Sequence, residues 1–230
     1  MHIGILGGGL SGVSFQYFLK HNSEVLEAQE VVGGLCRTFQ KDGFSYDIGG
    51  HILYSKDADW MAWVRRLLAS NCRECRRANQ VLYKGRYVKY PFENGLGGLE
   101  KEEAYECLIG YLQNPYPKPS NFREWIYHTF GKGIAEKYLI PYNEKIWKYP
   151  LERMGLEWVE RVPKPPACDI VKSALGLETE GYLHQLNFLY PKEGGIQSFV
   201  QSFVKDSSRI TTGFKISHVK KISGGWSVSD

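Results

Sequence analysis

The chain has 230 residues, 43% of them hydrophobic, and a formal net charge of +4. This size and composition allow a substantial hydrophobic core and exclude a disordered protein. The basic residues are too sparse to form a surface that follows nucleic-acid phosphates, so no nucleic-acid partner is expected.

The apolar segments are shorter than a membrane span, and the N-terminal residues lack the basic region and the cleavage site of a signal peptide. We therefore expect a cytoplasmic protein without a membrane partner, and a homo-oligomer is one alternative for its assembly. The five cysteines are an odd number, which favours reduced thiols over disulfides. The C-x-x-C pair Cys72 and Cys75 lacks the further ligands of a zinc site, so no metal site is expected.

The chain begins with a strand, a glycine-rich turn, a helix and a second strand over residues 3–26. In the G-x-G-x-x-G turn, Gly7 allows the tight turn and Gly9 lets backbone N–H groups approach a pyrophosphate. Gly12 lets the helix pack closely on the strand. Glu27 ends the second strand, where a carboxylate can accept hydrogen bonds from a ribose hydroxyl. The pattern predicts a Rossmann-like dinucleotide site, and a turn that serves only packing is the alternative.

Changes in hydrophobic period predict the remaining elements. Helices are expected over residues 59–69, 99–112, 121–130 and 196–204, a hairpin over 81–90, and short strands over 210–228. Pro141 is expected to break the helical segment before it. Three parts follow: a Rossmann-like portion over residues 1–80, a substrate-binding hairpin and helical insert over 81–190, and a helix with a β-meander returning to the sheet over 191–230.

A second glycine segment lies shortly after Glu27. Gly33 and Gly34 offer backbone N–H groups, and Arg37 offers a guanidinium. These groups would stand where the phosphates of a bound dinucleotide lie.

A third glycine segment precedes a histidine. Gly49 and Gly50 would let a loop approach the flat face of a ligand, and His51 would place an imidazole beside it. An ordinary structural histidine is the alternative.

An aromatic and amide set lies farther along the chain. Tyr90 and Phe92 belong to the predicted hairpin and the turn after it. Asn143 and Trp147 are four residues apart, so a helix would place them on one face, with a ring for stacking beside an amide for hydrogen bonds. An asparagine beside a proline can also be an ordinary helix cap.

Together these motifs resemble a known family. The opening turn with Glu27, followed by G-G-L-C-R-T at residues 33–38, is similar to the FAD-binding start of the superfamily of flavin amine oxidases, protoporphyrinogen oxidases and UDP-galactopyranose mutases. Later stretches resemble UDP-galactopyranose mutase, in particular its eukaryotic-type branch. They are G-F-S-Y-D-I-G-G-H at 43–51, G-R-Y-V-K-Y-P-F at 85–92, F-G-K-G-I-A at 130–135, P-Y-N at 141–143, E-W-V-E-R-V at 157–162 and Y-P-K-E-G-G at 190–195.

The resemblance implies an isomerase that interconverts UDP-galactopyranose and UDP-galactofuranose and feeds lipopolysaccharide or other surface-glycan synthesis. Reduced FAD would supply the nucleophile without net redox change. By position, the cofactor would be held by Gly7, Gly9, Gly12, Glu27, Gly33, Gly34, Arg37, Gly49, Gly50 and His51.

The resemblance also implies how the substrate would be held. The uridine would be bound by Tyr90, Phe92, Asn143 and Trp147. Arg161 would pair with the diphosphate and, with His51, form the catalytic set, although Arg161 could instead pair with Glu157 on a helix. Glu93 departs from the family pattern, in which glutamine is expected, because a carboxylate cannot donate to a uracil carbonyl.

The expected fold is α/β: a Rossmann-like FAD domain with a helical insert and the start of a mixed-sheet substrate domain. The family's second half, with its further flavin and diphosphate contacts, does not fit before Asp230, so the chain is expected to be an N-terminal portion. Weak FAD retention and no turnover by this chain alone are therefore expected. The alternatives are an oxidoreductase like the amine or protoporphyrinogen oxidases and a non-catalytic nucleotide-binding remnant.

Overall fold

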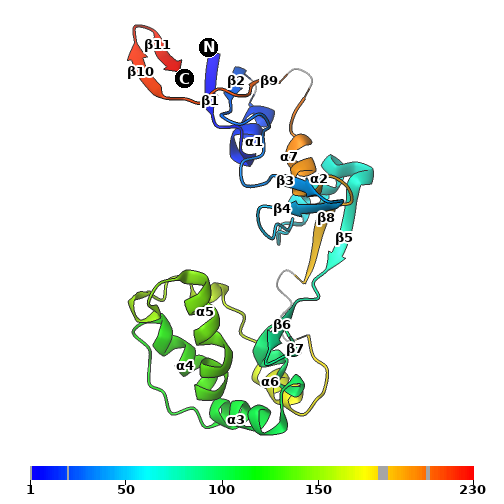
Figure 1. Cartoon of the computed structure of the whole chain (residues 1–230), viewed down its shortest axis with the longest axis vertical. Helices are drawn as coiled ribbons and strands as arrows, with labels where there is room; N and C mark the ends of the chain where they lie inside the picture. The colour runs from blue at the N-terminus through cyan, green and yellow to red at the C-terminus, as the bar shows by residue number, and fades with distance from the viewer. Residues whose placement is uncertain (1, 20, 181–185, 206–207) are drawn as a thin grey trace. The chain divides into compact units, whose positions relative to one another are not determined.

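The computed structural model describes residues 2–19, 21–180, 186–205 and 208–230. The chain forms two compact units, which are described separately. Unit 1 consists of Met1–Arg76 with Asn187–Asp230, and unit 2 consists of Arg77–Leu186. The predicted boundaries at residues 80 and 190 lie a few residues after the observed ones, at Arg76 and Leu186. The segment after 190 belongs to unit 1 together with the N-terminal segment (Figure 1).

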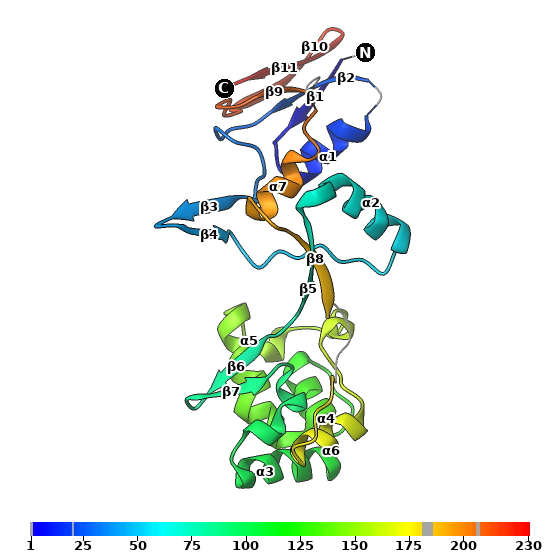
Figure 2. The ribbon, with the colours of Figure 1, turned by 90° about the vertical axis from the view of Figure 1, so that its right-hand side faces the viewer.

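A small parallel sheet opens unit 1. Its strand order is β1 (His2–Leu6), β2 (Asn22–Leu26) and β9 (Arg209–Thr211), and α1 (Leu10–Phe18) connects the first two. Parallel neighbours need such a crossover because a tight turn cannot join them. The predicted strand–helix–strand opening is confirmed. Figure 2 shows α1 against one face of this sheet and the hairpin of β10 (His218–Ile222) and β11 (Gly225–Ser229) on the other.

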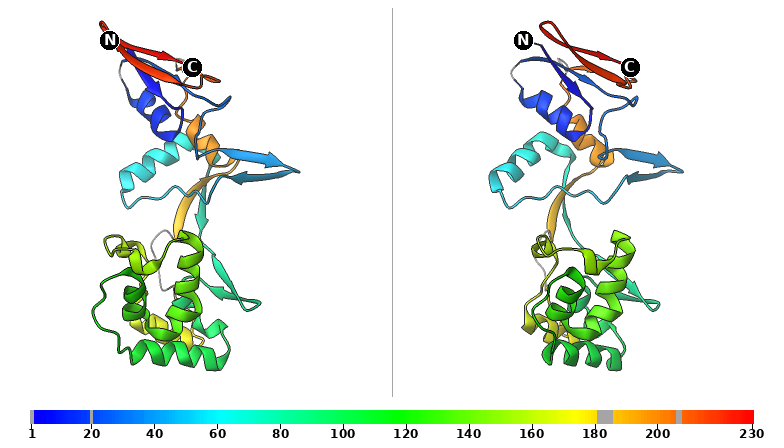
Figure 3. Two further views of the ribbon diagram at one scale, coloured as in Figure 1. Left: turned by 60° about the vertical axis from the view of Figure 1, so that its left-hand side comes forward. Right: turned by 90° about the vertical axis from the view of Figure 1, so that its left-hand side faces the viewer.

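Two further strand pairs complete unit 1, and sequence periodicity did not indicate either. The hairpin of β3 (Thr38–Lys41) and β4 (Phe44–Asp47) places Phe39 opposite Tyr46. It extends away from the sheet in both views of Figure 3. The other pair joins β5 (Cys72–Arg76) to β8 (Asn187–Pro191) in antiparallel register.

The core of unit 1 lies among its helices and β8. In α2 (Ala58–Leu68), Val64 and Leu68 are buried, as the predicted amphipathic pattern requires. In α7 (Gly195–Gln201), Ile196 and Phe199 join the same cluster. The predicted helices at 59–69 and 196–204 are thus confirmed, with slightly different ends.

Unit 2 consists of a hairpin and a group of helices. Strands β6 (Gln80–Tyr83) and β7 (Arg86–Lys89) pair as predicted, and Lys84 and Gly85 form the turn with positive φ angles. The helices are α3 (Lys101–Leu112), α4 (Phe122–Ile134), α5 (Ile140–Trp147) and α6 (Ala167–Ala174). Helix α6 was not predicted, because its eight residues follow a proline-rich stretch and carry only a short periodic pattern.

The expected break at Pro141 is wrong. The π-helix η4 (Ala135–Leu139) leads into α5, and Pro141 occupies the first turn of that helix. The backbone stays helical through Leu139 and Ile140, and the Ile140 N–H bonds to the Ala135 carbonyl five residues back. The proline, which has no N–H to donate, thus follows directly on a wider π-helical turn. The interruption lies earlier, at Gly131, whose φ of 72° is outside the helical region.

Short 3₁₀ segments connect these elements. They are η1 (Ala69–Asn71), η2 (Phe92–Asn94), η3 (Leu96–Gly98), η5 (Leu151–Arg153) and η6 (Val159–Arg161). The core of unit 2 contains several side chains with no exposure, such as Phe92, Phe122 and Ile126. Among the described residues, no helix is both long and apolar enough to cross a membrane.

Candidate functional site

The glycine turn between β1 and α1 has little room for side chains. Gly7 has a φ of 101°, and its N–H donates to the Leu26 carbonyl at 2.8 Å, which ties the turn to the end of β2. A Cβ at Gly12 would overlap the Gly7 carbonyl oxygen. The helix can therefore begin this close to the turn only with glycine at that position.

The N-terminus of α1 presents uncapped backbone donors. Gly9 is the N-cap residue, no side chain caps the helix, and its first turn contains no acidic residue. The first N–H groups of a helix have no intrahelical acceptor and lie at the positive end of the helix dipole. This end of α1 therefore favours an anion.

Glu27 lies directly behind the glycine turn and is buried, with 8% exposure. Its carboxylate accepts the Gly8 N–H at 2.6 Å and the Gln29 N–H at 2.8 Å. Each oxygen keeps a lone pair for a hydroxyl group. Gly8 was missed by the sequence analysis, although its place inside the motif was the available signal.

The second glycine segment packs on the first. The Gly33 N–H donates to the Gly8 carbonyl at 2.8 Å, and Gly34 lies against Gly9, because a Cβ on it would stand 3.1 Å from the Gly9 Cα. The Arg37 Nε donates to the Gly34 carbonyl at 3.0 Å. The predicted residues 7–12, 27 and 33–37 are therefore brought together around one turn.

His51 follows β4 in a loop with Gly49 and Gly50. Its Nδ1 atom is buried and has no hydrogen-bond partner in the described part of the chain. A Cβ at Gly50 would meet no atom within 4 Å, and one at Gly49 would come no closer than 3.9 Å to the His51 ring. An unpartnered buried nitrogen is costly, and a bound ligand atom would remove that cost.

The carboxylate of Asp47, four residues before His51, joins β4 to three other segments of unit 1. It accepts hydrogen bonds from Thr38 Oγ1 at 2.6 Å, Tyr190 OH at 2.5 Å and the Ile196 N–H at 3.2 Å. Burial, and then the Asp47 carboxylate, raise the pKa of Tyr190 to about 12. Sequence reasoning missed this cluster, because its members come from β3, β4, β8 and the start of α7.

In unit 2, Phe92 is the first ring of an aromatic column. It stacks on Tyr138 with centroids 4.8 Å apart, and Tyr138 stacks on Tyr142 at 5.0 Å. Phe92 is fully buried, whereas Tyr142 is 39% exposed. The column therefore runs from the core to the surface. The spacing of four residues between the two tyrosines within a helical run was the signal that sequence reasoning did not use.

Glu93 lies beside this column and is 1% exposed. Its Oε2 atom is buried without a hydrogen-bond partner among the described residues. Burial raises the pKa of Glu93 to about 8, so its carboxyl is neutral at pH 7. A neutral carboxyl carries an O–H donor, so the lack of a donor inferred from the sequence applies only to the ionised form above that pKa.

Tyr90 lies three residues before Glu93, directly after β7, and it is half-buried. It is near enough to Tyr138 to help raise the pKa of that phenol, whose main cause is burial. Tyr90 and Glu93, which flank Phe92 in the sequence, therefore lie near the middle ring of the aromatic column, Tyr138.

Asn143 and Trp147 share one face of α5, as their spacing predicted, but their polar atoms face each other. The Trp147 Nε1 donates to Asn143 Oδ1 at 3.1 Å, and Asn143 Nδ2 donates to the Leu139 carbonyl at 2.7 Å. Asn143 is 8% exposed and Trp147 is 46% exposed. The ring is open to a ligand, whereas the amide is used within the protein.

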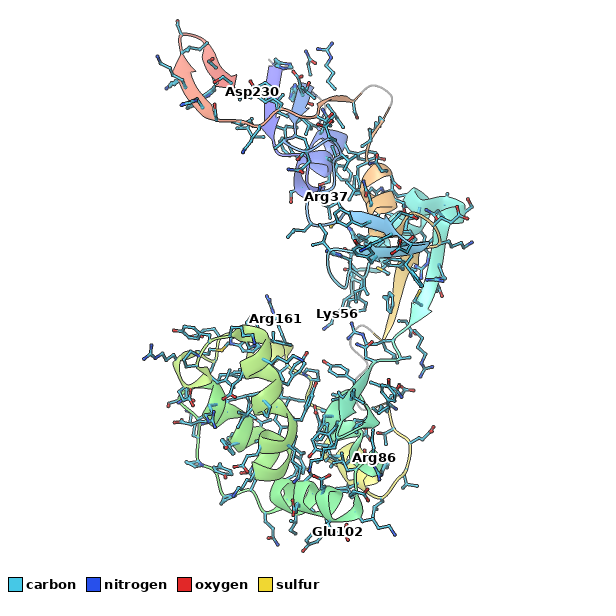
Figure 4. All side chains as sticks on the ribbon, in the orientation of Figure 1. Arg37, Lys56, Arg86, Glu102, Arg161 and Asp230 are labelled. Atoms are coloured by element: carbon cyan, nitrogen blue, oxygen red, sulfur yellow. The ribbon has the colours of Figure 1, made fainter. Side chains whose placement is uncertain are left out.

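Arg161 ends η6 and is exposed. Figure 4 shows its side chain projecting outward from unit 2. It makes no ion pair or side-chain hydrogen bond within the described ranges, so the alternative pairing with Glu157 is not formed. Arg161 is therefore a free cation. Within the described ranges, no three His, Cys, Asp or Glu side chains lie close enough together to hold a metal ion.

The geometry brings the predicted residues together as two sets. The residues predicted for the cofactor lie in unit 1, and those predicted for the substrate lie in unit 2. A protein family described as the NAD(P)-binding Rossmann-like domain matches residues 5–67, which contain the whole of the first set.

Solved structures of known proteins share the fold over nearly the whole chain. UDP-galactopyranose mutase in its reduced form is 29% identical, with a TM-score of 0.81, over 94% of this chain and 49% of the mutase. A protein from Exiguobacterium described as a protoporphyrinogen oxidase is 20% identical, with a TM-score of 0.63, over 99% of this chain and 56% of its own. A putrescine oxidase mutant is 16% identical, with a TM-score of 0.56, over 99% of this chain and 54% of its own.

These similarities establish the class of protein to which the fold belongs. The chain has a mixed α/β fold with a Rossmann-like dinucleotide-binding domain, and its fold is that of the FAD-dependent oxidoreductase-like superfamily. Within that superfamily, the similarity to UDP-galactopyranose mutase reaches 29% identity. The chain spans about half the length of each of the three solved structures. The predicted α/β fold class is confirmed.

Proposed function

We propose that this chain belongs to an FAD-dependent enzyme that interconverts UDP-galactopyranose and UDP-galactofuranose, with the product serving surface-glycan synthesis. The observation that carries the proposal is the similarity to UDP-galactopyranose mutase. Identity is 29% and the TM-score is 0.81, against 20% and 0.63 for the protein described as a protoporphyrinogen oxidase.

The residues of unit 1 fit a flavin dinucleotide. The open N-terminus of α1 and the closely packed glycines would receive the diphosphate, and Glu27 would accept hydrogen bonds from a ribose. The unpartnered Nδ1 of His51 would find its partner on the flavin. Arg37, whose Nε is bound to its own loop, would offer its remaining N–H groups to the diphosphate.

The residues of unit 2 fit the nucleotide part of the substrate. The exposed ring of Trp147 would stack on a planar base, and the free guanidinium of Arg161 would pair with the diphosphate. Tyr90 would line the uridine site together with the exposed end of the aromatic column at Tyr142, and the fully buried Phe92 would support that column from the core. When bound, reduced FAD would supply the nucleophile, and the protein would position the substrate.

Binding is the first test. The chain is titrated with FAD and, separately, with UDP by isothermal titration calorimetry, and both should bind. Gly12→Ala should weaken FAD binding and leave UDP binding unchanged, because the added Cβ overlaps the Gly7 carbonyl. Gly4→Ala is the matched control, since a Cβ at Gly4 meets no atom within 4 Å. Binding of UDP without FAD would favour a non-catalytic nucleotide-binding protein.

Turnover is the second test. The full gene product, loaded with FAD, is incubated with UDP-galactopyranose with and without dithionite, and the sugar nucleotides are separated by chromatography. UDP-galactofuranose should form only after reduction. Failure with bound, reduced flavin present would contradict the mutase proposal. Substrate oxidation with formation of hydrogen peroxide would favour an oxidase.

A further inference from the structure

The side-chain amide of Asn143 has a role that its predicted place in a ligand site does not describe. Its oxygen accepts the indole N–H of Trp147 at 3.1 Å, and its nitrogen donates to the Leu139 carbonyl at 2.7 Å. Only 8% of the residue is exposed. The amide is therefore engaged on both sides and turned into the protein, which leaves little capacity for direct contact with a ligand.

Trp147 is held at two points. Its Nε1 is bound to Asn143, and its ring meets the ring of Trp158 with centroids 5.2 Å apart and an interplanar angle of 64°. A side chain with two χ angles that is held by a directional hydrogen bond and an edge contact keeps one orientation. Because 46% of Trp147 is nevertheless exposed, the ring is a fixed surface open to solvent.

Trp158 connects this surface to the free cation. Its ring packs on the buried ring of Phe122 at 4.5 Å, and its carbonyl accepts the Arg161 N–H at 3.0 Å. The turn that carries Arg161 therefore starts from the residue that supports Trp147. Trp158 therefore contacts the ring of Trp147 and also begins the turn that carries the guanidinium of Arg161.

We propose that Asn143 is a positioning residue, which acts on a bound nucleotide through Trp147 by fixing the indole for stacking. The inference rests on the proposed function for its ligand, a planar base that carries a diphosphate. The base stacks on Trp147, and Arg161 remains available to the charged group.

A double-mutant cycle separates this role from direct contact. UDP affinity is measured by calorimetry for the whole chain with Asn143→Ala, Trp147→Phe and both changes. Each single variant should weaken UDP binding about tenfold, the scale of a stacked base. The double variant should bind no more weakly than Trp147→Phe. If Asn143→Ala causes a further full loss in the Trp147→Phe background, Asn143 contacts the ligand directly and the inference is overturned.

A spectroscopic signature tests the contact without a ligand. The indole N–H proton resonance of Trp147 is assigned by its disappearance in Trp147→Phe. It should shift in Asn143→Ala. It should stay near its original position in Asn143→Asp at a pH at which the buried carboxyl is protonated, because the O–H then donates to the Leu139 carbonyl and the other oxygen still accepts the indole N–H. Asn143→Asp should also keep UDP affinity within about threefold of the unmodified chain. Loss of binding in that variant with an unshifted resonance would overturn the inference.

Asn114→Ala is the matched control. Asn114 also donates its amide to backbone carbonyls of unit 2, those of Tyr127 and His128, but it does not contact Trp147. This variant should change neither the indole resonance nor the UDP affinity. No UDP binding by the unmodified chain would overturn the proposed function together with this inference. Binding with an additive cycle would overturn the inference alone.

Discussion

At the scale of single residues, the buried carboxyl of Glu93 makes the stability of unit 2 depend on pH. Burial raises its pKa from 4.5 to about 8 in the folded chain. Between these values the unfolded chain ionises Glu93 and the folded chain does not, so rising pH favours unfolding. The full effect is on the order of 4 kcal/mol near pH 8, at about 1.4 kcal/mol per pH unit.

We therefore expect Glu93→Gln to raise the melting temperature relative to the unmodified chain at pH 8. At pH 4.5 the two proteins should melt at nearly the same temperature, because both then carry a neutral side chain at this position. Thermal unfolding followed by circular dichroism at several pH values measures the difference. Glu102→Gln, at an exposed position of α3, is the control and should show no such trend. An equal difference at both pH values would contradict the burial argument.

The sequence predicted the contacts of the cofactor residues better than the contacts of the substrate residues. The relation of Gly7, Gly12 and Glu27 is local and follows from backbone geometry, which a sequence pattern records directly. The burial of Glu93 depends on helices packed from other parts of unit 2. The Asn143 amide is engaged within its own helical run, by Leu139 and Trp147, and the four-residue spacing does not record that these polar atoms face each other. A residue's type states which hydrogen bonds it can form, but only the fold determines which are already taken.

At the scale of elements, the Asp47 carboxylate is one of the contacts that tie the β3–β4 hairpin to the start of α7, beside the hydrogen bonds between Thr38 and Gln197. Tyr190→Phe removes one donor from that carboxylate and leaves the ring in place. We expect a loss of about 1.5–3 kcal/mol in the free energy of unfolding, the range for a hydrogen bond to a charged group. Urea unfolding monitored by tryptophan fluorescence measures it.

The companion variants show whether the cluster acts as a unit. Asp47→Ala should destabilise unit 1 more than Tyr190→Phe does, since it removes the acceptor for Thr38 and Ile196 as well. In the double variant the losses should not add, because the same hydrogen bond is removed twice. Fully additive losses would show that Tyr190 and Asp47 stabilise the fold independently.

Element prediction succeeded where one segment carried its own periodic pattern. Helix α2 and the β6–β7 hairpin were both recognised in this way, from an apolar stripe and from a glycine turn between alternating residues. The β5–β8 pair was missed because its strands come from distant parts of the chain, and neither has a local partner. The error at Pro141 had a different cause: the helical backbone continues through a π-helix just before the proline, and the residue pattern does not record that turn.

At the scale of the whole molecule, the two units differ in how the chain builds them. Unit 2 is the continuous segment Arg77–Leu186 with its own core, whereas unit 1 needs both ends of the chain. A separately expressed segment Arg77–Leu186 should therefore fold and melt cooperatively. Circular dichroism and chemical-shift dispersion test this expectation. Residues 1–76 expressed alone should not fold, because β8, α7 and β9 are absent.

The discontinuity of unit 1 also sets an order of events during protein synthesis. Strand β2 leaves the ribosome long before β9, and β5 long before β8, so neither pair can form until the later strand has been translated. In the chain, unit 2 lies between the two strands of each pair, so it can fold before β8 and β9 have been synthesised. During that interval, the edge of β2 that β9 later covers is unpaired, and an unpaired strand edge is a site for aggregation. A chaperone that binds nascent chains would therefore protect the N-terminal segment more than unit 2.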